Sequence, residues 1–165
     1  MTCVIHPFAP VFDETSRVLI LGTIPSPQSR KNGFYYSHPQ NEFWHVLAVL
    51  LNEKQPQTTE EKKAFLLKHH IAVWDVLHSC EMEGASDSRI RCPIPNDFSV
   101  LLASAPIRQI FTTGKKATEL YQKLCEPRNR RAAVYLPSTS PANRYWFPYP
   151  KLLEAYRVLL PYLEE

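Results

Sequence analysis

Four short apolar runs recur along the chain, and the segments between them follow helical patterns. The runs span residues 18–21, 71–74, 107–112 and 133–136. They lack the alternation of apolar and polar residues that a half-exposed strand shows, so we expect strands that are buried on both faces. Such strands separated by helices are typical of a parallel sheet covered on both sides. The pattern predicts an α/β fold with three α/β/α layers around a central four-stranded parallel sheet.

Helical periodicity fills the intervening segments. Thr58 followed three residues later by Glu61 indicates a helix start, and Asn96 is a candidate cap for a later helix. The expected helices span residues 41–52, 58–67, 96–104, 115–125 and 150–162. The chain has 165 residues, of which 44% are hydrophobic, which is enough for one compact core. We therefore expect a single domain over residues 1–165.

The loops that follow the four strands stand out by length and composition. Ligands of open α/β sheets bind at the carboxyl ends of the strands. The segments in that position span residues 22–40, 75–95, 113–115 and 137–149. All but the third are long and rich in proline, serine, asparagine and aromatic residues, which is unusual for simple connections. Function is therefore expected in these loops.

Charge, cysteine spacing and hydropathy bear on DNA binding, metal binding and membrane insertion. The formal net charge is +3, and the basic residues form small groups in expected loops, which is compatible with binding to DNA phosphates. The four cysteines contain no CxxC pair, so we expect no metal and no cofactor. The longest apolar run, residues 46–51, is too short for a bilayer, and no signal-peptide pattern is present. A soluble, cytoplasmic protein with no membrane contact is expected.

The segment of residues 22–44 carries the most suggestive chemistry. Gly22 opens a turn with Pro25 and Pro27, where the backbone can bend and approach a ligand. The turn matches neither the GxGxxG fingerprint nor the phosphate-binding GxxxxGK[ST] loop. Residues 33–44 then place three aromatic side chains, a histidine and two carboxamides in one loop that ends at a helix start.

These residues resemble a known family. The runs 22–25, 34–36, 38–41 and 43–44 are similar to the first motif region of the uracil-DNA glycosylase superfamily. The similarity is greatest to the hypoxanthine-DNA (deoxyinosine) glycosylase branch, followed by the mismatch-specific uracil-DNA glycosylases. Residues 6–11, 74–80 and 136–143 also resemble that branch, so nearly the whole chain is covered. The resemblance implies a uracil-DNA glycosylase-like fold and excision of a deaminated base from DNA.

The chemistry of base excision suits these residue types. Breaking the N-glycosidic bond builds positive charge on the sugar and negative charge on the departing base, which must be held outside the DNA stack. Phe34 is the expected stacking platform and Tyr35 the alternative, with packing under the loop as the competing interpretation. Asn41 matches an asparagine treated as functional in the deoxyinosine branch. It is expected to orient a water molecule or bind the base, and it also suits a helix N-cap.

One departure from the family pattern narrows the substrate. Related branches carry Asp or Asn two residues after the motif glycine, where it activates water. Ile24 occupies that place and cannot orient a proton. The resemblance therefore favours the deoxyinosine branch, and strong activity on uracil is not expected. It also implies that catalysis depends more on stabilisation of the leaving base than on activation of water. Gly22 and Ile24 are expected to shape the base pocket, with His38 in a lesser role.

The last loop and the basic groups are expected to contact DNA. Ser138 matches the place where other branches carry His or Asn against the base. Asp75 is either a carboxylate of the pocket or a cap of the next turn. Trp146 and Phe147 either wedge into the base stack or, as is favoured, seat the final helix. The predicted DNA contacts and wedge residues are Ser26, Arg30, Lys31, Lys115, Ser140, Pro141, Ala142, Asn143 and Arg144.

The sequence thus predicts a monomeric, monofunctional DNA glycosylase that acts on deaminated bases, hypoxanthine first, and leaves an abasic site. Two alternatives remain open at this point. One is a uracil or mismatch-specific glycosylase of the same fold, against which Ile24 argues. The other is a non-catalytic protein that binds a damaged base or single-stranded DNA through the aromatic residues 34–36. Formation of product separates this binder from the enzyme.

Overall fold

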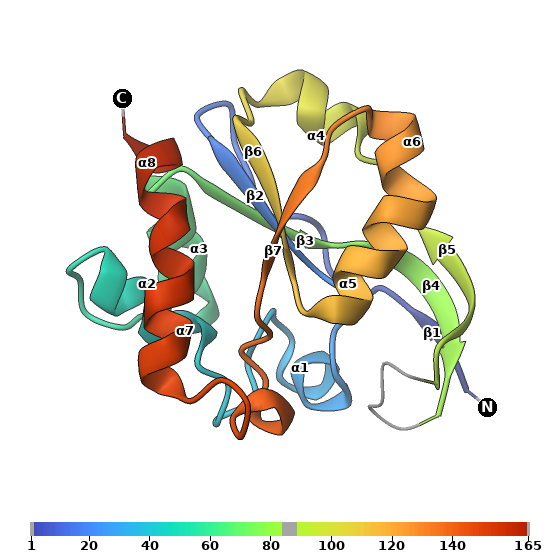
Figure 1. Cartoon of the computed structure of the whole chain (residues 1–165), viewed down its shortest axis with the longest axis horizontal. Helices are drawn as coiled ribbons and strands as arrows, with labels where there is room; N and C mark the ends of the chain where they lie inside the picture. Colours follow the sequence, from blue (N-terminus) through green and yellow to red (C-terminus); the bar gives the residue numbers. More distant parts are fainter. Residues whose placement is uncertain (1, 84–88, 165) are drawn as a thin grey trace.

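The computed structural model describes residues 2–83 and 89–164, which form two sheets and the helices that cover them (Figure 1). The strands are β1 (Thr2–Ile5), β2 (Val18–Gly22), β3 (Ile71–Asp75), β4 (Leu77–Met82), β5 (Arg91–Pro95), β6 (Gln109–Thr113) and β7 (Ala133–Leu136). The α-helices are α1 (Pro27–Asn32), α2 (Phe43–Leu50), α3 (Thr59–Lys68), α4 (Ser99–Ser104), α5 (Lys115–Leu120), α6 (Glu126–Asn129), α7 (Tyr149–Tyr156) and α8 (Leu160–Leu163). A π-helical turn, η2 (Tyr121–Cys125), extends α5, and short 3-10 turns are η3 (Pro141–Asn143) and η4 (Arg157–Leu159).

The central sheet has four parallel strands in the order β3-β2-β6-β7. Each strand falls on one of the four predicted apolar runs, so the predicted parallel sheet is confirmed. Within β2, Val18 and Ile20 pack into one apolar core, while Leu19 and Leu21 pack into another. Successive side chains of a strand point to opposite faces, so a strand buried on both faces shows no polar alternation.

Helices cover both faces of this sheet. On one face, α2, α3 and α7 supply buried residues such as Leu47, Leu66 and Leu152 to the core that contains Val18 and Ile20. On the other face, α4 and α5 close the second core, and Figure 1 shows the two groups of helices on opposite sides of the sheet. The predicted three-layer α/β/α architecture is confirmed.

A second sheet corrects one expectation. Residues 75–95 were expected to form a long loop, but they contain β4 and β5, which pair antiparallel with each other, and β4 also pairs antiparallel with β1 near the N-terminus. β4 was not predicted because its burial is mixed: Leu77, Cys80 and Met82 are buried, whereas His78 and Glu81 are exposed. The polar residues of β4 and the prolines of β5 weaken the strand pattern in the sequence, so neither strand was predicted.

The helix starts partly follow the predictions. Thr58 caps α3 as expected, because its hydroxyl accepts from the Glu61 amide and the Glu61 carboxylate accepts from the Thr58 amide. The expectation that Asn96 caps α4 is wrong. Its buried side-chain amide instead donates to the main-chain oxygens of Asp75 and Leu77, at 2.9 and 3.1 Å, and so ties the end of β3 to β4.

The Thr58 cap gives a first testable expectation. Thr58→Ala removes the acceptor for an otherwise unpaired helix amide, so it should lower the free energy of unfolding by about 1 kcal/mol. Urea unfolding followed by circular dichroism measures this change. Thr59→Ala, one residue into the helix, is the matched control and should cost clearly less. Equal losses for the two variants would contradict the capping role.

No helix within residues 2–83 and 89–164 is long and apolar enough to span a bilayer.

Candidate active site

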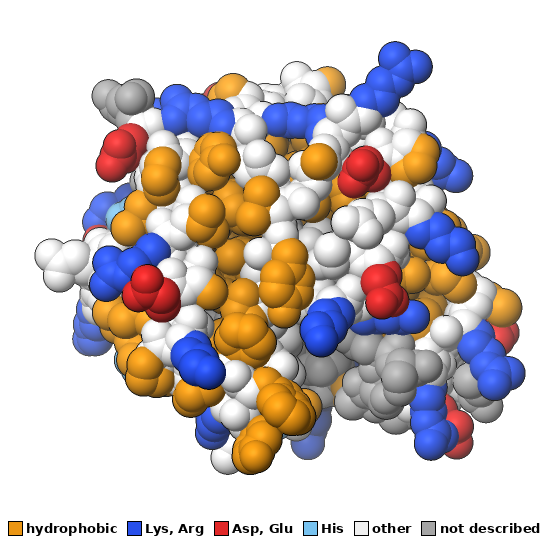
Figure 2. All heavy atoms as spheres, viewed as in Figure 1, with side chains coloured by type: hydrophobic (Ala, Val, Ile, Leu, Met, Phe, Trp, Pro, Cys, Tyr) orange, Lys and Arg blue, Asp and Glu red, His pale blue; other side chains and the backbone are white. Residues whose placement is uncertain are grey.

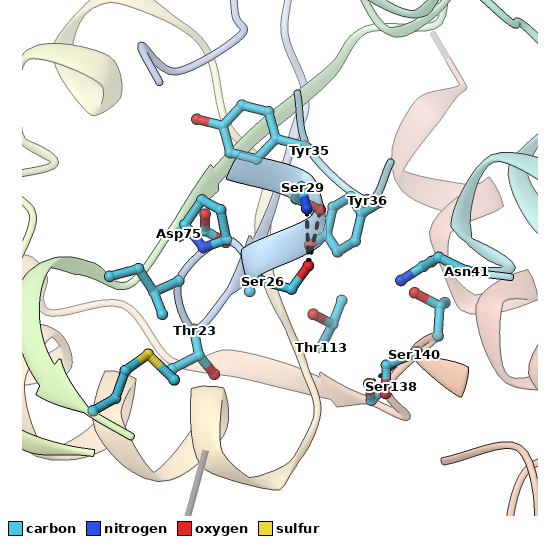
Figure 3. Close-up of a pocket in the computed structure, with 15 residues that line it drawn as sticks. Thr23, Ser26, Ser29, Tyr35, Tyr36, Asn41, Asp75, Thr113, Ser138 and Ser140 are labelled. Carbon is cyan, nitrogen blue, oxygen red and sulfur yellow. Dashed lines mark hydrogen bonds between the residues drawn. The ribbon is translucent and has the colours of Figure 1, made fainter. Parts of the chain in front are cut away.

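A cavity of about 160 Å³ lies at the carboxyl ends of the parallel strands. Its walls come from the segments that follow β2, β3, β6 and β7, and Figure 3 shows their polar side chains converging on it. The lining residues are Gly22, Thr23, Ile24, Pro25, Ser26, Ser29, Tyr35, Tyr36, Asn41, Asp75, Met82, Thr113, Ser138, Thr139 and Ser140. The loops after the strands, where function was expected, therefore line a cavity.

Gly22 allows the floor of this cavity to form. A Cβ atom at Gly22 would lie 2.6 Å from Asp75 Oδ1 and 3.1 Å from the Tyr36 hydroxyl oxygen. Gly22 and Asp75 are also partners across the β2–β3 ladder, which fixes the carboxylate beside the glycine. The missing side chain thus leaves room for two polar groups to approach the same spot.

Asp75 is a buried carboxylate with one engaged oxygen. Its Oδ2 lies 2.7 Å from His6 Nε2, and the two side chains are 5% and 2% exposed. The Phe8 amide donates to His6 Nδ1 at 3.1 Å, so that nitrogen carries no hydrogen. His6 is therefore the neutral tautomer that donates its Nε2–H to Asp75. No described residue donates to Oδ1, which lies against Gly22 at the cavity floor.

Tyr36 presents its hydroxyl to the same floor. The residue has a left-handed backbone with φ +51°, and its ring stacks on Phe43 at a centroid distance of 3.9 Å. Burial, followed by the charge of Asp75, raises the pKa of the Tyr36 phenol well above its usual range, and neighbouring Thr113 offsets part of this rise. Tyr36 thus remains a neutral O–H donor. Its buried oxygen has no hydrogen-bond partner of normal geometry among the described residues.

Asn41 reaches the cavity from the start of α2. Its Oδ1 accepts from the Phe43 amide at 2.9 Å, so the carboxamide oxygen is occupied by the helix start. Its Nδ2 is the end left to face a ligand, and Figure 3 shows the side chain extending toward Tyr36 across the cavity. Asn41 was expected to serve as the N-cap, but the N-cap of α2 is Glu42; the Asn41 oxygen still bonds to the first helical amide, which leaves its N–H group as a donor for chemistry.

The loop after β7 closes the remaining wall. The Glu42 amide donates to the Thr139 carbonyl at 3.1 Å, and Arg144 donates to the Gln40 carbonyl at 2.7 Å. These bonds hold residues 137–144 against the Asn41 loop. Thr139 is 2% exposed, and its hydroxyl has no partner among the described residues. The junction of the two loops therefore adds an unsatisfied polar group to the cavity.

The structure gathers part of the predicted site and separates the rest. The predicted residues that line the cavity are Gly22, Ile24, Ser26, Tyr35, Asn41, Ser138 and Ser140. Phe34 and His38 lie outside it. Phe34 is 4% exposed and packs on Tyr35 and Trp44 in the apolar core, so this geometry gives no support to a stacking role. His38 accepts from the Gln40 amide within its own loop.

The predicted DNA contacts lie around the cavity. Lys31 is exposed at the end of α1 and Lys115 at the start of α5, while Arg30 donates to the Pro25 carbonyl. In the last loop, η3 comprises Pro141, Ala142 and Asn143, and Asn143 donates to the Ser138 carbonyl. Ser26 caps α1 with its hydroxyl. These residues belong to segments that line the cavity or directly adjoin residues that do, and their role toward DNA remains a prediction.

One expectation about the last loop is wrong. Trp146 was expected to seat the final helix, but it is 69% exposed, and neighbouring Tyr145 is 84% exposed. Their rings contact each other edge to face at 4.9 Å. Phe147 does pack against the core, as expected.

Sequence reasoning did not assign several residues of this site, among them His6, Tyr36, Thr113 and Thr139. Tyr36 was considered only as part of an aromatic run, because its positive φ has no signature in that run. His6 lies 69 residues from Asp75, so its contact has no local signal. The motif resemblance of residues 6–11 was the one available hint. Within the described residues, no group of three or more His, Cys, Asp or Glu side chains is placed to hold a metal ion.

Comparison with known proteins places this site in a family. Residues 9–163 match the model of the uracil DNA glycosylase superfamily. A hypoxanthine DNA glycosylase of Methanosarcina acetivorans is 40% identical over 83% of this chain and 87% of its own length. A second, from Methanosarcina barkeri, is 34% identical over the same shares.

A solved structure supports the same assignment. It is a solution NMR structure of a Methanosarcina acetivorans protein provisionally described as a uracil DNA glycosylase. The TM-score is 0.83 at 32% identity, and the match covers 99% of this chain and all of the other. With this fold, this cavity and these relatives, the chain belongs to the uracil DNA glycosylase superfamily.

Proposed function

We propose that this protein is a monofunctional DNA glycosylase that hydrolyses the N-glycosidic bond of deaminated bases, with hypoxanthine preferred. One observation carries the proposal. The cavity at the strand ends holds the Tyr36 and Thr139 hydroxyls, which are buried without partners among the described residues, and beside them the half-buried Asn41 amide. Buried polar groups without partners cost stability, so they favour a ligand with a polar edge. The names of the two curated relatives support hypoxanthine as that ligand.

Asn41 is the proposed catalytic residue. Because its Oδ1 is held by the Phe43 amide, its Nδ2 acts as an oriented donor. Negative charge develops on the base as the glycosidic bond breaks, and a fixed N–H donor to the base stabilises that charge. This geometry favours stabilisation of the leaving base over activation of water by Asn41. Ile24, which is 9% exposed, adds an apolar wall where other branches place a water-activating side chain.

The proposed reaction leaves an abasic site without cutting the strand. A glycosylase that also acts as a lyase needs an amine to form a Schiff base with the sugar. Among the described residues that line the cavity none is a lysine, and Lys31 lies exposed at the end of α1. Hydrolysis is therefore the chemistry that this cavity supports.

DNA is proposed to bind across the rim of the cavity. Lys31, Lys115 and Arg144 are exposed there and suit phosphate contacts. Figure 2 shows hydrophobic side chains gathered at the lower edge of the molecule, where Figure 1 places the loop after β7. Exposed Tyr145 and Trp146 belong to this loop, beside the predicted wedge of residues 141–143. Apolar groups in such a position fill the gap left by a flipped nucleotide. We propose a monomer that acts in the cytoplasm.

Duplexes that carry one hypoxanthine, uracil or xanthine test this function. After incubation with the protein, alkali cleaves each strand at any abasic site. We expect fast formation of alkali-labile sites at hypoxanthine, slower formation at uracil and no break before alkali. Tight binding of the duplexes without any alkali-labile site would instead identify a binding protein. Faster action on uracil would favour the uracil glycosylase alternative.

A further inference from the structure

Part of the cavity lining is apolar, whereas most of the lining side chains carry polar groups. Ile24, in the turn after β2, and Met82, at the end of β4, both line the cavity. They are 9% and 3% exposed, and they belong to the same buried apolar cluster. Figure 3 shows Thr23, which precedes Ile24, on the side of the cavity away from Asn41 and Ser140. We refer to Ile24 and Met82 as the apolar wall.

Main-chain oxygens in the turn before Ile24 are already engaged. The Val76 amide donates to the Gly22 carbonyl at 2.8 Å, and the Leu77 amide donates to the Thr23 carbonyl at 3.0 Å. These bonds tie the turn to the junction of β3 and β4. A polar group of a ligand that met the apolar wall would therefore lose its water without gaining these oxygens as partners, which is unfavourable.

Three purine bases differ in the substituent on one ring carbon. Hypoxanthine carries only hydrogen at C2, whereas guanine carries an amino group there and xanthine a carbonyl oxygen beside a further ring N–H. All three share the ring N–H and the carbonyl at the neighbouring edge, so that edge does not separate them. Guanine is a normal base of DNA and must be left intact by an enzyme that removes hypoxanthine. The distinction between the two has to be made at C2.

We propose that the apolar wall faces C2 of the base and makes the enzyme selective for hypoxanthine over guanine and xanthine. A C–H group at C2 packs on Ile24 and Met82, while an amino group or a carbonyl oxygen in the same place is left unpaired. This inference rests on the proposed glycosylase function and names a determinant of its base preference. It also gives Ile24 a role of its own in the place where related branches carry a water-activating residue.

Met82 reaches the cavity through the second sheet. Its pairing with Thr2 of β1 fixes the end of β4, and the Met82 side chain is buried whereas that of Glu81 is exposed. An unbranched thioether fills irregular space and adapts to its neighbours, so it suits a contact with the flat edge of a base. Glutamine has a side chain of similar length, but its amide both donates and accepts hydrogen bonds. The substitution Met82→Gln therefore changes the polarity of the wall with little change in its size.

Met82→Gln should relax the selectivity at C2. The test substrates are duplexes that carry hypoxanthine or xanthine at the same position. Single-turnover rates of each variant are divided by the wild-type rate on the same duplex, which cancels the intrinsic reactivity of each base. Because the new amide pairs with the polar group at C2, the xanthine-to-hypoxanthine ratio should rise about tenfold or more. Met82→Leu is the matched apolar control, and its ratio should stay close to that of the wild-type protein.

Ile24 provides an independent pair of variants. Ile24→Val and Ile24→Thr have nearly the same shape and differ by a methyl group against a hydroxyl group. The wall stays apolar in Ile24→Val, so the ratio should be kept, whereas Ile24→Thr should raise it in the same direction as Met82→Gln. A purely structural role of the wall would lower the rates on both duplexes together. Thermal unfolding of each variant verifies that folded proteins are being compared.

The outcomes separate this inference from the proposed function. A wild-type protein that releases no base removes the function itself. A wild-type protein that releases hypoxanthine, with the ratio unchanged in Met82→Gln and Ile24→Thr, overturns the role of the apolar wall alone. An equal rise in Met82→Leu and Ile24→Val also overturns it, because space and not polarity would then set the selectivity. If Met82→Gln does not fold, the Ile24 pair decides. Release of guanine by the wild-type protein as fast as hypoxanthine would contradict the inference directly.

Discussion

Replacing Asn41 with aspartate should lower the single-turnover rate of hypoxanthine release by about 100-fold to 1,000-fold, the cost of removing one oriented donor from an active site. The substitution is selective because aspartate keeps the oxygen that accepts from the Phe43 amide. It replaces the Nδ2 donor that faces the cavity with a carboxylate oxygen, which accepts hydrogen bonds and does not donate. Gel analysis of alkali-treated duplex over time measures the rate.

Asn41→Ala serves as the companion variant. It loses both the donor and the helix-start bond, so it should be as inactive as Asn41→Asp and also less stable by about 1 kcal/mol. If Asn41→Asp is as stable as the wild-type protein, its loss of activity reflects the missing donor and not a defect in folding. A fast Asn41→Asp enzyme would contradict the donor role, because a carboxylate at this position activates water and cannot donate to the leaving base.

Gly22→Ala should be the second most damaging substitution. The added methyl group would lie 2.6 Å from Asp75 Oδ1, which is closer than real Cβ atoms approach. The carboxylate must move, and with it the Asp75 oxygen that lines the cavity floor. We expect a loss of about 1–3 kcal/mol in the free energy of unfolding, as for other overpacked sites. The rate of hypoxanthine release should fall at least about tenfold, the equivalent of one misplaced hydrogen bond of about 1.4 kcal/mol.

A double-mutant cycle identifies the clash as the cause. Asp75→Ala removes the group that the new methyl would meet, so the double variant Gly22→Ala with Asp75→Ala should be more stable than additivity predicts. Its activity should remain low, because the acceptor is gone. Urea unfolding of the four proteins in the cycle measures the coupling. Additive losses of stability would show that Gly22 acts through something other than room for Asp75.

The sheet was predictable because its signal is local. Two strands gave the clearest signal: β2 and β3 are almost continuous apolar runs, and burial on both faces is what produces such runs. The strand β4 escaped because the polar residues His78, Ser79 and Glu81 interrupt its buried residues without regular alternation, and because its pairing partner β1 lies some 75 residues earlier in the chain. Local patterns carry no information about a partner at that distance.

The site was predictable to the level of its loops but not of its side chains. Asn41 was found because it stands in a motif. Its side chain lines the cavity and accepts a hydrogen bond from the Phe43 amide at the start of α2. Phe34 and Tyr36 are two residues apart; the sequence favoured Phe34, whereas Tyr36 is the one that lines the cavity. The left-handed backbone at Tyr36 turns its side chain to the floor, while Phe34 points into the core. The pairing of His6 with Asp75 exists only after folding.

The most direct test is to measure the free base and the abasic site together. Wild-type protein is incubated with a duplex containing one hypoxanthine, and released base is quantified by chromatography alongside alkali-labile strand. We predict one free hypoxanthine for each alkali-labile site and intact strands before alkali. Saturated binding of the duplex with no released hypoxanthine would contradict the glycosylase assignment.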